Sequence, residues 1–167
     1  VAINETAYGA ALMNLVLNAQ GALSGENGQI IVNLGFEKAA TVPMYALGES
    51  LDTCPAVCIE VIDNGCGMTP EIRDHIFEPF FSTKPKGKGL GLTNVLSTVR
   101  EASGSIACES RVGEGSAFRI WLPVGSMATT DVPAVEFVTE SSPRKLPVIL
   151  VEEIERAATK HGSGLCR

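Results

Sequence analysis

The chain has 167 residues, a mass of 17.6 kDa and 45% apolar residues, which is enough for one domain with a hydrophobic core and some additional chain. A formal net charge of −6 and a pI of about 4.9 exclude a surface built to neutralise nucleic-acid phosphates, so neither DNA nor RNA is an expected partner. The sequence has no apolar run long enough to cross a membrane. We therefore expect a cytoplasmic chain without direct membrane contact, and a parent protein anchored in a membrane is compatible with this. Its five cysteines show no C-x-x-C pairing, which predicts reduced side chains rather than a zinc site.

The first part of the chain predicts one helix and one strand. Apolar residues at helical spacing predict a buried helix over residues 5–23, which ends at the glycines 25 and 28. Alternating apolar residues then predict a strand over residues 30–36 with one buried face. The segment 39–55 contains Pro, Gly and Asp without periodicity, so we interpret it as a surface loop.

The middle of the chain predicts a central strand that leads into loops. Residues 57–62 are apolar on both faces apart from Glu60, as expected for a strand inside a sheet. Thr69 can cap a short helix that has a proline at its first position and runs to His75. Residues 77–91 are rich in Gly, Pro and Lys, which indicates a long mobile loop.

A helix and a hairpin follow this loop. Apolar residues three or four positions apart predict a helix over residues 92–102 that ends near Gly104. Residues 105–110 and 117–122 then read as two strands of a hairpin, and Pro123 closes the domain. The side chains of the second strand expected to face the core are Phe118, Ile120 and Leu122.

The composition divides the chain into three parts. Residues 1–124 form the predicted domain, and residues 125–146 have the Ser, Thr, Pro and small-residue content of a linker. The tail, residues 147–167, begins with an apolar strand, continues with the acidic pair Glu152 and Glu153, and ends in a weak helix. A single strand and helix cannot bury a core of their own.

Asp63 at the end of the central strand is a candidate for binding a base. Its carboxylate can accept a hydrogen bond from the exocyclic amino group of adenine, whereas guanine presents a carbonyl acceptor at the corresponding edge. The glycines at 65 and 67 let the backbone approach a flat ligand. An ordinary Asp-Asn-Gly turn is the alternative interpretation, and this segment alone does not separate the two.

Two further patterns suit phosphates and a metal ion. The glycine-rich segment 87–92 lies at a helix start, where free backbone N–H groups and the helix dipole favour a phosphate chain. Lys84, Lys86 and Lys88 add positive charge. Asn14 and Asn18 share one helix face, and their amide oxygens can bind Mg²⁺. Taken singly, these patterns also fit a solvated loop and two surface asparagines.

In their order and spacing, these segments together resemble the catalytic and ATP-binding domain of sensor histidine kinases, within the larger family of gyrase, Hsp90 and MutL. The resemblance covers residues 1–124. The matching segments are 14–19 for the N box, 63–68 for the G1 box, 76–84 for the F box, 87–92 for the G2 box and 113–123 for the last hairpin.

This resemblance implies an α/β two-layer sandwich of the Bergerat type, in which a mixed sheet packs against helices and a lid between Phe77 and Gly91 covers ATP. Asp63 would bind the adenine amino group, while Asn14 and Asn18 would hold Mg²⁺ against the phosphates. The other residues that it places at the nucleotide are Gly65, Gly67, Met68, Phe77, Phe80, Thr83, Lys84, Lys88, Gly89, Leu90, Gly91, Leu92 and Ser116. Within this set, Phe77 and Phe80 would seat the lid.

The residue at position 14 discriminates between activities in the family. The ATPase relatives carry a Glu general base where this chain has Asn14, and an amide cannot take a proton from water. The resemblance therefore implies a protein histidine kinase, with Asn14 as the catalytic residue, that uses Mg-ATP in two-component signalling. The alternatives are a module that binds nucleotide or a partner without catalysis, and an ATPase of the gyrase, Hsp90 or MutL type.

The resemblance also implies partners that this chain does not contain. The family's phosphoaccepting histidine lies on dimerisation helices before the N box, and His75 and His161 lack that context, so we expect both at the surface and the fragment alone to be inactive in autophosphorylation. A response regulator or a fused receiver domain would accept the phosphoryl group. Residues 150–153 are similar to the first strand and acidic pair of a receiver; a disordered or expression-derived tail is the alternative. Gly21 and Ala22 stand where some family members carry basic phosphate contacts.

Overall fold

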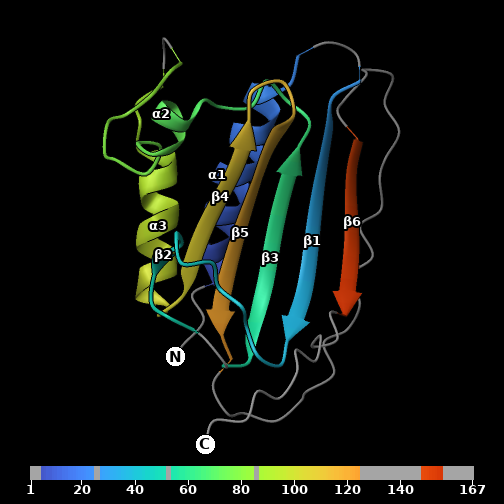
Figure 1. The fold of residues 1–167 in the computed structure, drawn as a ribbon, viewed down its shortest axis with the longest axis vertical. Helices are drawn as coiled ribbons and strands as arrows, with labels where there is room; N and C mark the ends of the chain where they lie inside the picture. The colour runs from blue at the N-terminus through green and yellow to red at the C-terminus, as the bar shows by residue number, and fades with distance from the viewer. Residues whose placement is uncertain (1–4, 25–26, 52–53, 85–86, 125–147, 156–167) are drawn as a thin grey trace, which may run out of the picture.

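The computed structural model describes residues 5–24, 27–51, 54–84, 87–124 and 148–155. Its fold is a sheet with helices packed on one face (Figure 1). This arrangement confirms the α/β two-layer sandwich. The helices are α1 (Glu5–Ala22), α2 (Pro70–Arg73) and α3 (Gly91–Glu101). The strands are β1 (Gln29–Glu37), β2 (Leu47–Gly48), β3 (Ala56–Asp63), β4 (Ser105–Arg111), β5 (Gly115–Pro123) and β6 (Val148–Glu155).

The strand order places β3 and β5 inside the sheet. The order is β2-β4-β5-β3-β1-β6; β6 runs parallel to β1 and every other neighbouring pair is antiparallel, so the sheet is mixed. In the register, Asp63 at the end of β3 lies opposite Ser116 on β5 and opposite Ile30 on β1. The candidate adenine-binding carboxylate is therefore held between two neighbouring strands.

The elements differ from the sequence-based expectation in two places. The segment 39–55 contains β2, which is only two residues long and has too few positions to show an alternating pattern. At the other end, β6 continues through Glu155, although we expected a helix after Glu153. Residues 156–167, where the rest of that helix was expected, and the linker 125–146 lie outside the described residues.

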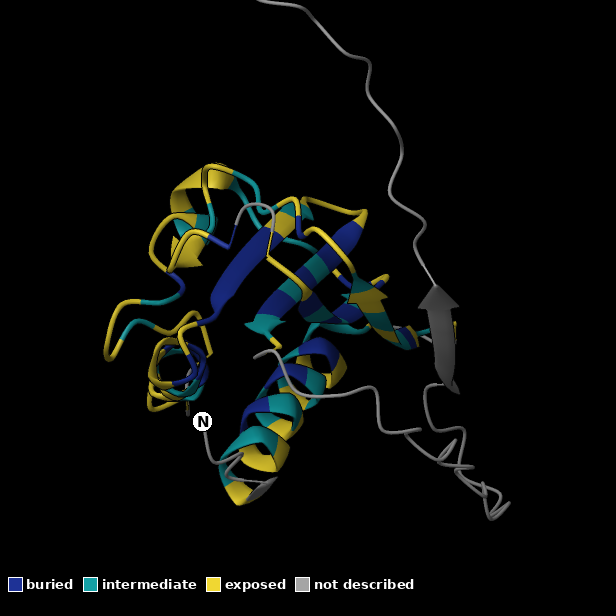
Figure 2. Ribbon diagram, turned by 90° about the horizontal axis from the view of Figure 1, so that it is seen from below, coloured by how far each residue is buried: buried dark blue, intermediate teal, exposed yellow. Residues whose placement is uncertain are grey.

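The main core fills the space between the helices and the sheet. Apolar side chains on α1 and α3 face the sheet at helical spacing, and Figure 2 shows the resulting buried stripe along α1. The most deeply buried members are Leu15 on α1, Val95 on α3, Val61 on β3 and Ile106 on β4. Both Phe118 and Ile120 belong to this core and Leu122 packs against it, as the hairpin pattern predicted.

The opposite face of the sheet carries a smaller apolar cluster and a row of polar side chains. Trp121 packs there with residues from the segment between β1 and β3. The buried carboxylate of Glu60 accepts hydrogen bonds from Arg119 Nε at 2.6 Å and from Asn33 Nδ2 at 2.7 Å. These partners compensate the charge of Glu60, which otherwise would make burial at the sheet centre costly. Among the described helices, none is both long and apolar enough to span a bilayer.

Candidate nucleotide-binding site

Asp63 provides a buried acceptor at the end of β3. Only 4% of the residue is exposed, and its Oδ1 accepts a hydrogen bond from the Gly65 N–H at 2.8 Å. Burial raises the pKa of this carboxyl above its ordinary value, while the N–H groups of Gly65 and Ser116 partly oppose the rise. No ion pair joins Asp63 to a cation of the described chain. Its carboxylate is thus a strong acceptor for a neutral donor such as an amino group.

The glycine loop after Asp63 is confined between α1 and the β4–β5 hairpin. Cys66 N donates to the Ala22 carbonyl at 2.9 Å, which ties the loop to the end of α1. A Cβ atom at Gly65 would lie 2.6 Å from that same carbonyl oxygen. Gly67 has a φ of +64°, and a Cβ atom there would overlap the carbonyl of Arg111. Both glycines are therefore needed for the loop to pass this gap.

Ser116 lies in a small network of hydroxyl groups beside the loop. Ser110 Oγ accepts from Met68 N at 2.9 Å, donates to the Gly115 carbonyl at 2.9 Å, and lies 3.0 Å from Ser116 Oγ. Ser116 is itself buried opposite Asp63. The network ties the backbone of Met68 to the hairpin that holds Ser116 opposite Asp63. Sequence reasoning missed Ser110, because an isolated serine in a strand carries no pattern.

Asn14 of α1 faces the start of α3, and Asn18 lies one turn further along α1. Both Asn14 and Asn18 are partly buried, and neither side chain is hydrogen-bonded to another described residue. Asn14 Oδ1 lies 3.6 Å from the position that a Cβ atom would take on Gly91, the first residue of α3. The amide oxygen of Asn14 is therefore available between α1 and the beginning of α3, as a cation bound to phosphates would require.

The first turn of α3 is free to bind an anion. Leu90 occupies the N-cap position without a side-chain hydrogen bond to the helix, and the first turn contains no acidic residue. The backbone N–H groups of that turn thus have no capping side chain. Leu92 packs against the core, and Thr93 Oγ1 donates to the Phe77 carbonyl at 3.3 Å, which anchors the turn to the preceding segment.

The lid is fastened at its base by backbone contacts. Phe80 N donates to the Gly89 carbonyl at 2.9 Å, and both residues have positive φ angles. Phe77 packs against the main core, whereas Phe80 is 78% exposed and does not. Phe81, which we did not single out from the sequence, packs against the core instead. Thr83, Lys84 and Lys88 are exposed on the lid.

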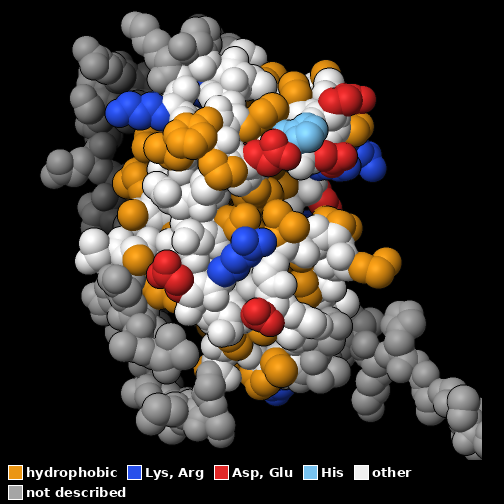
Figure 3. Space-filling view, turned by 90° about the vertical axis from the view of Figure 1, so that its left-hand side faces the viewer, with side chains coloured by type: hydrophobic (Ala, Val, Ile, Leu, Met, Phe, Trp, Pro, Cys, Tyr) orange, Lys and Arg blue, Asp and Glu red, His pale blue; other side chains and the backbone are white. Residues whose placement is uncertain are grey.

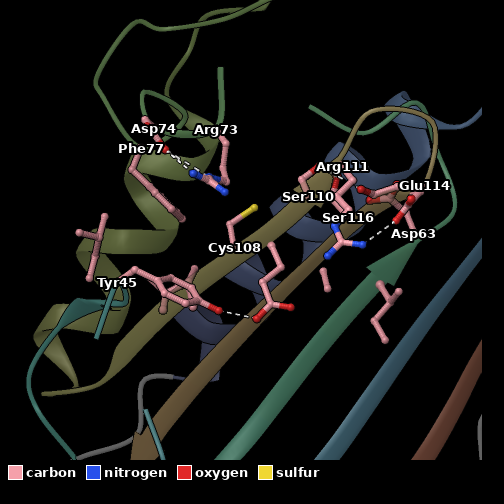
Figure 4. A pocket seen from close by; sticks show the side chains of 17 residues that line it. Tyr45, Asp63, Arg73, Asp74, Phe77, Cys108, Ser110, Arg111, Glu114 and Ser116 are labelled. Atoms are coloured by element: carbon pink, nitrogen blue, oxygen red, sulfur yellow. Dashed lines mark hydrogen bonds and ion pairs between the residues drawn. The ribbon is translucent and has the colours of Figure 1, made fainter. Parts of the chain in front are cut away.

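One cavity of about 850 Å³ brings together three of the nominated residues, Asp63, Phe77 and Ser116. Figure 4 shows Asp63 and Ser116 at one end of it and Phe77, Arg73 and Asp74 of the α2 region at the other. Asn14 and Asn18 do not line this cavity. The candidate site therefore has two parts, the cavity beside Asp63 and the junction of α1 with α3.

Two reactive side chains near the site have ordinary structural explanations. Cys108 lines the cavity, but burial raises the pKa of its thiol to about 12, so it stays protonated. His75 is exposed and pairs with Glu78 at 2.7 Å, and this hydrogen bond raises the pKa of the imidazole. Figure 3 shows the histidine of this surface next to acidic side chains. Neither residue is placed to react with a nucleotide beside Asp63.

Comparison with known protein families shows to which family this fold and site belong. The model of the family described as "Histidine kinase-, DNA gyrase B-, and HSP90-like ATPase" matches residues 3–126. The chain belongs to this family. The match spans α1 to β5 and so contains every nominated site residue. Use of ATP follows from membership of this family of ATP-binding domains.

The similar curated proteins of this family are sensor kinases. The chain is 36% identical to the sensor kinase CckA of Brucella abortus over 154 residues, which covers 84% of this chain and 16% of that protein. It is 39% identical to the sensor histidine kinase ZraS of Klebsiella oxytoca over 113 residues, covering 68% of this chain and 21% of that protein. The chain thus spans about a fifth of the length of these relatives. The CckA match extends beyond the residues of the family domain.

Solved structures support the same relationship. The mycobacterial sensor histidine kinase MprB matches with a TM-score of 0.55 and 26% identity over 72% of each chain. A nucleotide-free catalytic domain of the histidine kinase ThkA matches with a TM-score of 0.52 and 33% identity, covering 72% of this chain and 69% of the other. The two-layer fold is therefore that of histidine kinase catalytic domains.

Proposed function

We propose that this chain binds Mg-ATP and, when joined to dimerisation helices, donates the γ-phosphoryl group to a histidine on those helices. A response regulator or a fused receiver domain would then take the phosphoryl group, as in two-component signalling. The observation that carries the proposal is the buried carboxylate of Asp63, which lines a cavity and has no cation partner among the described residues.

In this proposal, each part of the site has a separate task. Asp63 accepts the hydrogen bond of the adenine amino group, and the two glycines let the loop after it pack closely against α1 and the β4–β5 hairpin. The first turn of α3 binds the phosphates through its free N–H groups. Asn14 and Asn18 offer amide oxygens to Mg²⁺, which would neutralise the charge that develops on the transferred group.

Position 14 favours transfer to a protein over hydrolysis. An amide cannot act as the general base that activates water, so the attacking group must come from elsewhere. Asn14 lies beside Gly91, at the point where the phosphate chain would meet α3. The similarity to CckA and ZraS, both described as sensor kinases, supports the same activity.

Phosphorylation assays with the chain alone and with added dimerisation helices test this proposal. With labelled ATP, the isolated chain should gain no acid-labile phosphate, whereas a fusion to phosphoaccepting helices should label the histidine of those helices. Asn14→Ala in the fusion should reduce labelling about 100-fold or more because the metal loses a ligand. Phosphate on His75 or His161 of the isolated chain would contradict the proposal, and steady hydrolysis of ATP by that chain would favour an ATPase instead. Nucleotide binding without labelling of the fusion would identify a binding module.

A further inference from the structure

Most of β4 has no neighbouring strand on the edge that faces away from β5. The short strand β2 pairs only with Ser105 and Ile106, and residues 107–111 of β4 continue beyond this pairing. Within the described sheet, β2 is the last strand on this side. Figure 1 shows the remaining part of β4 between β2 at one end and α2 at the other. We call residues 107–111 the free edge of β4.

The pairing with β2 shows which backbone groups point toward the free edge. Beside this pairing, Glu49 N donates to the Gly104 carbonyl at 3.1 Å. In an antiparallel ladder, the N–H and C=O groups of every second residue point to the same side. The backbone groups of Cys108 and Ser110 therefore point toward the free edge. Among the described residues, none forms a hydrogen bond with these groups from that side.

The free edge forms part of the wall of the cavity of about 850 Å³. Cys108 is only 8% exposed, and a buried backbone group without a partner is unfavourable. Figure 4 shows Phe77 and Arg73 on the side of β4 that faces away from β5. Asp63 lies on β3, and β5 separates β3 from β4. The free edge is therefore distinct from the part of the cavity assigned to adenine.

The side of the free edge that faces the helices is apolar. Cys108 belongs to the main core, and Phe77 packs against that core and lines the cavity. Leu47 lies opposite the core residue Ile106, so its side chain points to the same side of the sheet. A strand added at this edge would direct every second side chain toward these apolar groups.

The outer side of the free edge carries an ionised carboxylate. Glu109 Oε1 accepts hydrogen bonds from the Tyr45 hydroxyl and, at 3.1 Å, from Arg119. The hydrogen bond from Tyr45 and the charge of Arg119 lower the pKa of Glu109 below its ordinary value. No described residue donates a hydrogen bond to Glu109 Oε2. This oxygen is available to a cation of a ligand.

The charges around the cavity favour a basic ligand. Its charged lining residues are four acids and two bases, Asp63, Asp74, Glu109, Glu114, Arg73 and Arg111. The chain as a whole has a net charge of −6, which also attracts a basic partner. A second copy of this chain is unsuitable. Antiparallel pairing of two free edges through Cys108 and Ser110 would place the two copies of Glu109 opposite each other, and like charges at opposite positions destabilise a sheet.

We propose that the free edge of β4 binds an extended, basic segment of a partner protein as an additional strand. The backbone of this segment pairs with Cys108 and Ser110, a lysine or arginine faces Glu109, and the adjacent apolar side chains enter the cavity beside Phe77. An extended polypeptide fits because it presents donors and acceptors at the spacing of a strand. This inference does not depend on ATP binding.

A capped peptide with the sequence Thr-Val-Lys-Val-Lys-Val-Thr is a suitable probe. Calorimetry on the full chain would compare it with two modified forms, one N-methylated at both lysines and one at the first two valines. Alternate N–H groups of a strand point to opposite sides, so only one form loses the donors that face β4. That form should bind at least about tenfold more weakly, and the other should bind like the unmodified peptide. Equal affinities of the two forms, or no binding of the unmodified peptide at about 1 mM, would overturn the proposal.

Variants of the chain test the charge at the free edge. Glu109→Gln should weaken binding of the unmodified peptide about fivefold, the scale of one exposed ion pair. Glu101→Gln removes the same charge from α3, outside the cavity, and should bind the peptide like the parent. Equal affinities of these two variants would refute the placement of the basic residue opposite Glu109.

Amide exchange measured by NMR locates the bound peptide. The N–H groups of Cys108 and Ser110 should exchange more slowly when the peptide is bound, because it supplies their acceptors. The N–H group of Glu109 points toward β5, so its exchange should change less. Binding of the peptide without added protection of Cys108 and Ser110 would show that it occupies another surface, and the proposal would fail.

Discussion

At the scale of single residues, the buried carboxylate of Asp63 lowers the stability of the unliganded fold and offers a hydrogen-bond acceptor to a ligand. A carboxylate that is buried without a cation is unfavourable, and a ligand donor is one way to compensate it. Asp63→Asn should therefore weaken adenosine binding about tenfold to 100-fold, because an NH₂ group replaces one acceptor oxygen and meets the adenine amino group as a second donor. Isothermal titration calorimetry measures this loss.

Thermal unfolding of the same variant provides the complementary result. Asp63→Asn removes a buried charge while keeping an acceptor for the Gly65 N–H, so its melting temperature at neutral pH should equal or exceed that of the parent. Asp74→Asn makes the same charge change at an exposed residue of the same cavity and should leave adenosine binding unaltered. Equal affinity of parent and Asp63→Asn would refute the placement of adenine.

The raised pKa of Asp63 also makes binding depend on pH. The ionised carboxyl accepts the adenine amino group, and burial shifts its pKa above the ordinary 3.8, so protons compete with adenosine already at a higher pH than for an exposed aspartate. For the unliganded fold the sign is opposite. The folded pKa exceeds the unfolded one, hence the cost of Asp63 is present at neutral pH and is relieved as pH falls through the folded pKa. Adenosine titrations at successively lower pH, starting from neutral pH, should show a loss of affinity that Asp63→Asn lacks.

The sequence alone indicated some residues of the candidate site and not others. Asp63 and its glycines alone fit an ordinary turn as well as a base-binding loop, and the order of the boxes removed this ambiguity. The contacts of Ser110 and the free edge of β4 depend on distances between segments far apart in sequence. Such distances leave no periodic signal in one chain. The placement of ATP on the nominated residues stays a prediction.

At the scale of elements, the β4–β5 hairpin positions the glycine loop. Gly113 N donates to the Cys66 carbonyl at 2.8 Å, so the hairpin tip and the loop support each other. Gly115 has a φ of +100°, and a Cβ atom there would overlap the backbone carbonyl of Asp63. At Gly113 φ is +80°, but a Cβ atom would meet nothing within 4 Å. Both glycines have a φ that is unfavourable for other residues, but only at Gly115 would a side chain also overlap neighbouring atoms.

This difference predicts unequal losses of stability. Gly113→Ala should cost about 1 kcal/mol, because only its positive φ is unfavourable for alanine. Gly115→Ala should cost about 3 kcal/mol or more, since the same strain is joined by overlap with Asp63. Urea denaturation of both variants measures the two values. Similar losses in the two variants would mean that the backbone of β3 can shift to accommodate the new methyl group. The close contact between Gly115 and Asp63 would then contribute little to the free energy of unfolding.

The elements also show where patterns stop being informative. Long periodic segments predicted α1, α3 and the hairpin, because burial of one face requires apolar residues at fixed spacing. The strand β2 has only two residues and exists because Leu47 meets Ile106 at the edge of β4. We expected Phe80 to seat the lid, yet backbone pairing with Gly89 leaves it exposed while Phe81 packs inward. Which of two adjacent aromatic residues faces the core depends on local φ angles that composition does not reveal.

At the scale of the whole molecule, β6 adds a strand beyond the domain boundary expected at residue 124. It pairs with β1 in parallel register from Gln29 opposite Val148 to Phe36 opposite Glu155. The apolar run was visible in the sequence, but its pairing partner was not, because strand pairing depends on which sheet edge is free. Whether residues 147–167 begin a receiver domain stays a prediction.

A chain that ends at Val124 tests how the site and this added strand depend on each other. All nominated nucleotide-binding residues lie between α1 and β5. Within the described sheet, β6 pairs with β1 alone, at the opposite edge from β2. The truncated chain should therefore bind ATP with the affinity of the full chain. Its open β1 edge should instead promote self-association, since unpaired backbone groups and the exposed Leu34 would face solvent. Sedimentation velocity over a range of concentrations measures this tendency.

Leu34→Lys in the truncated chain is the control for edge pairing, because a charged side chain on an edge strand opposes association between sheets. It should restore the monomer without changing ATP affinity. A truncated chain that lost ATP binding while remaining folded would show instead that pairing with β6 stabilises β1, and through β1 the position of Asp63 on β3. The antiparallel register, which sets Ile30 opposite Asp63, provides the direct route for such an effect. The outcome thus decides whether the sheet acts as a rigid support for the site or as a coupling element between the site and the chain beyond it.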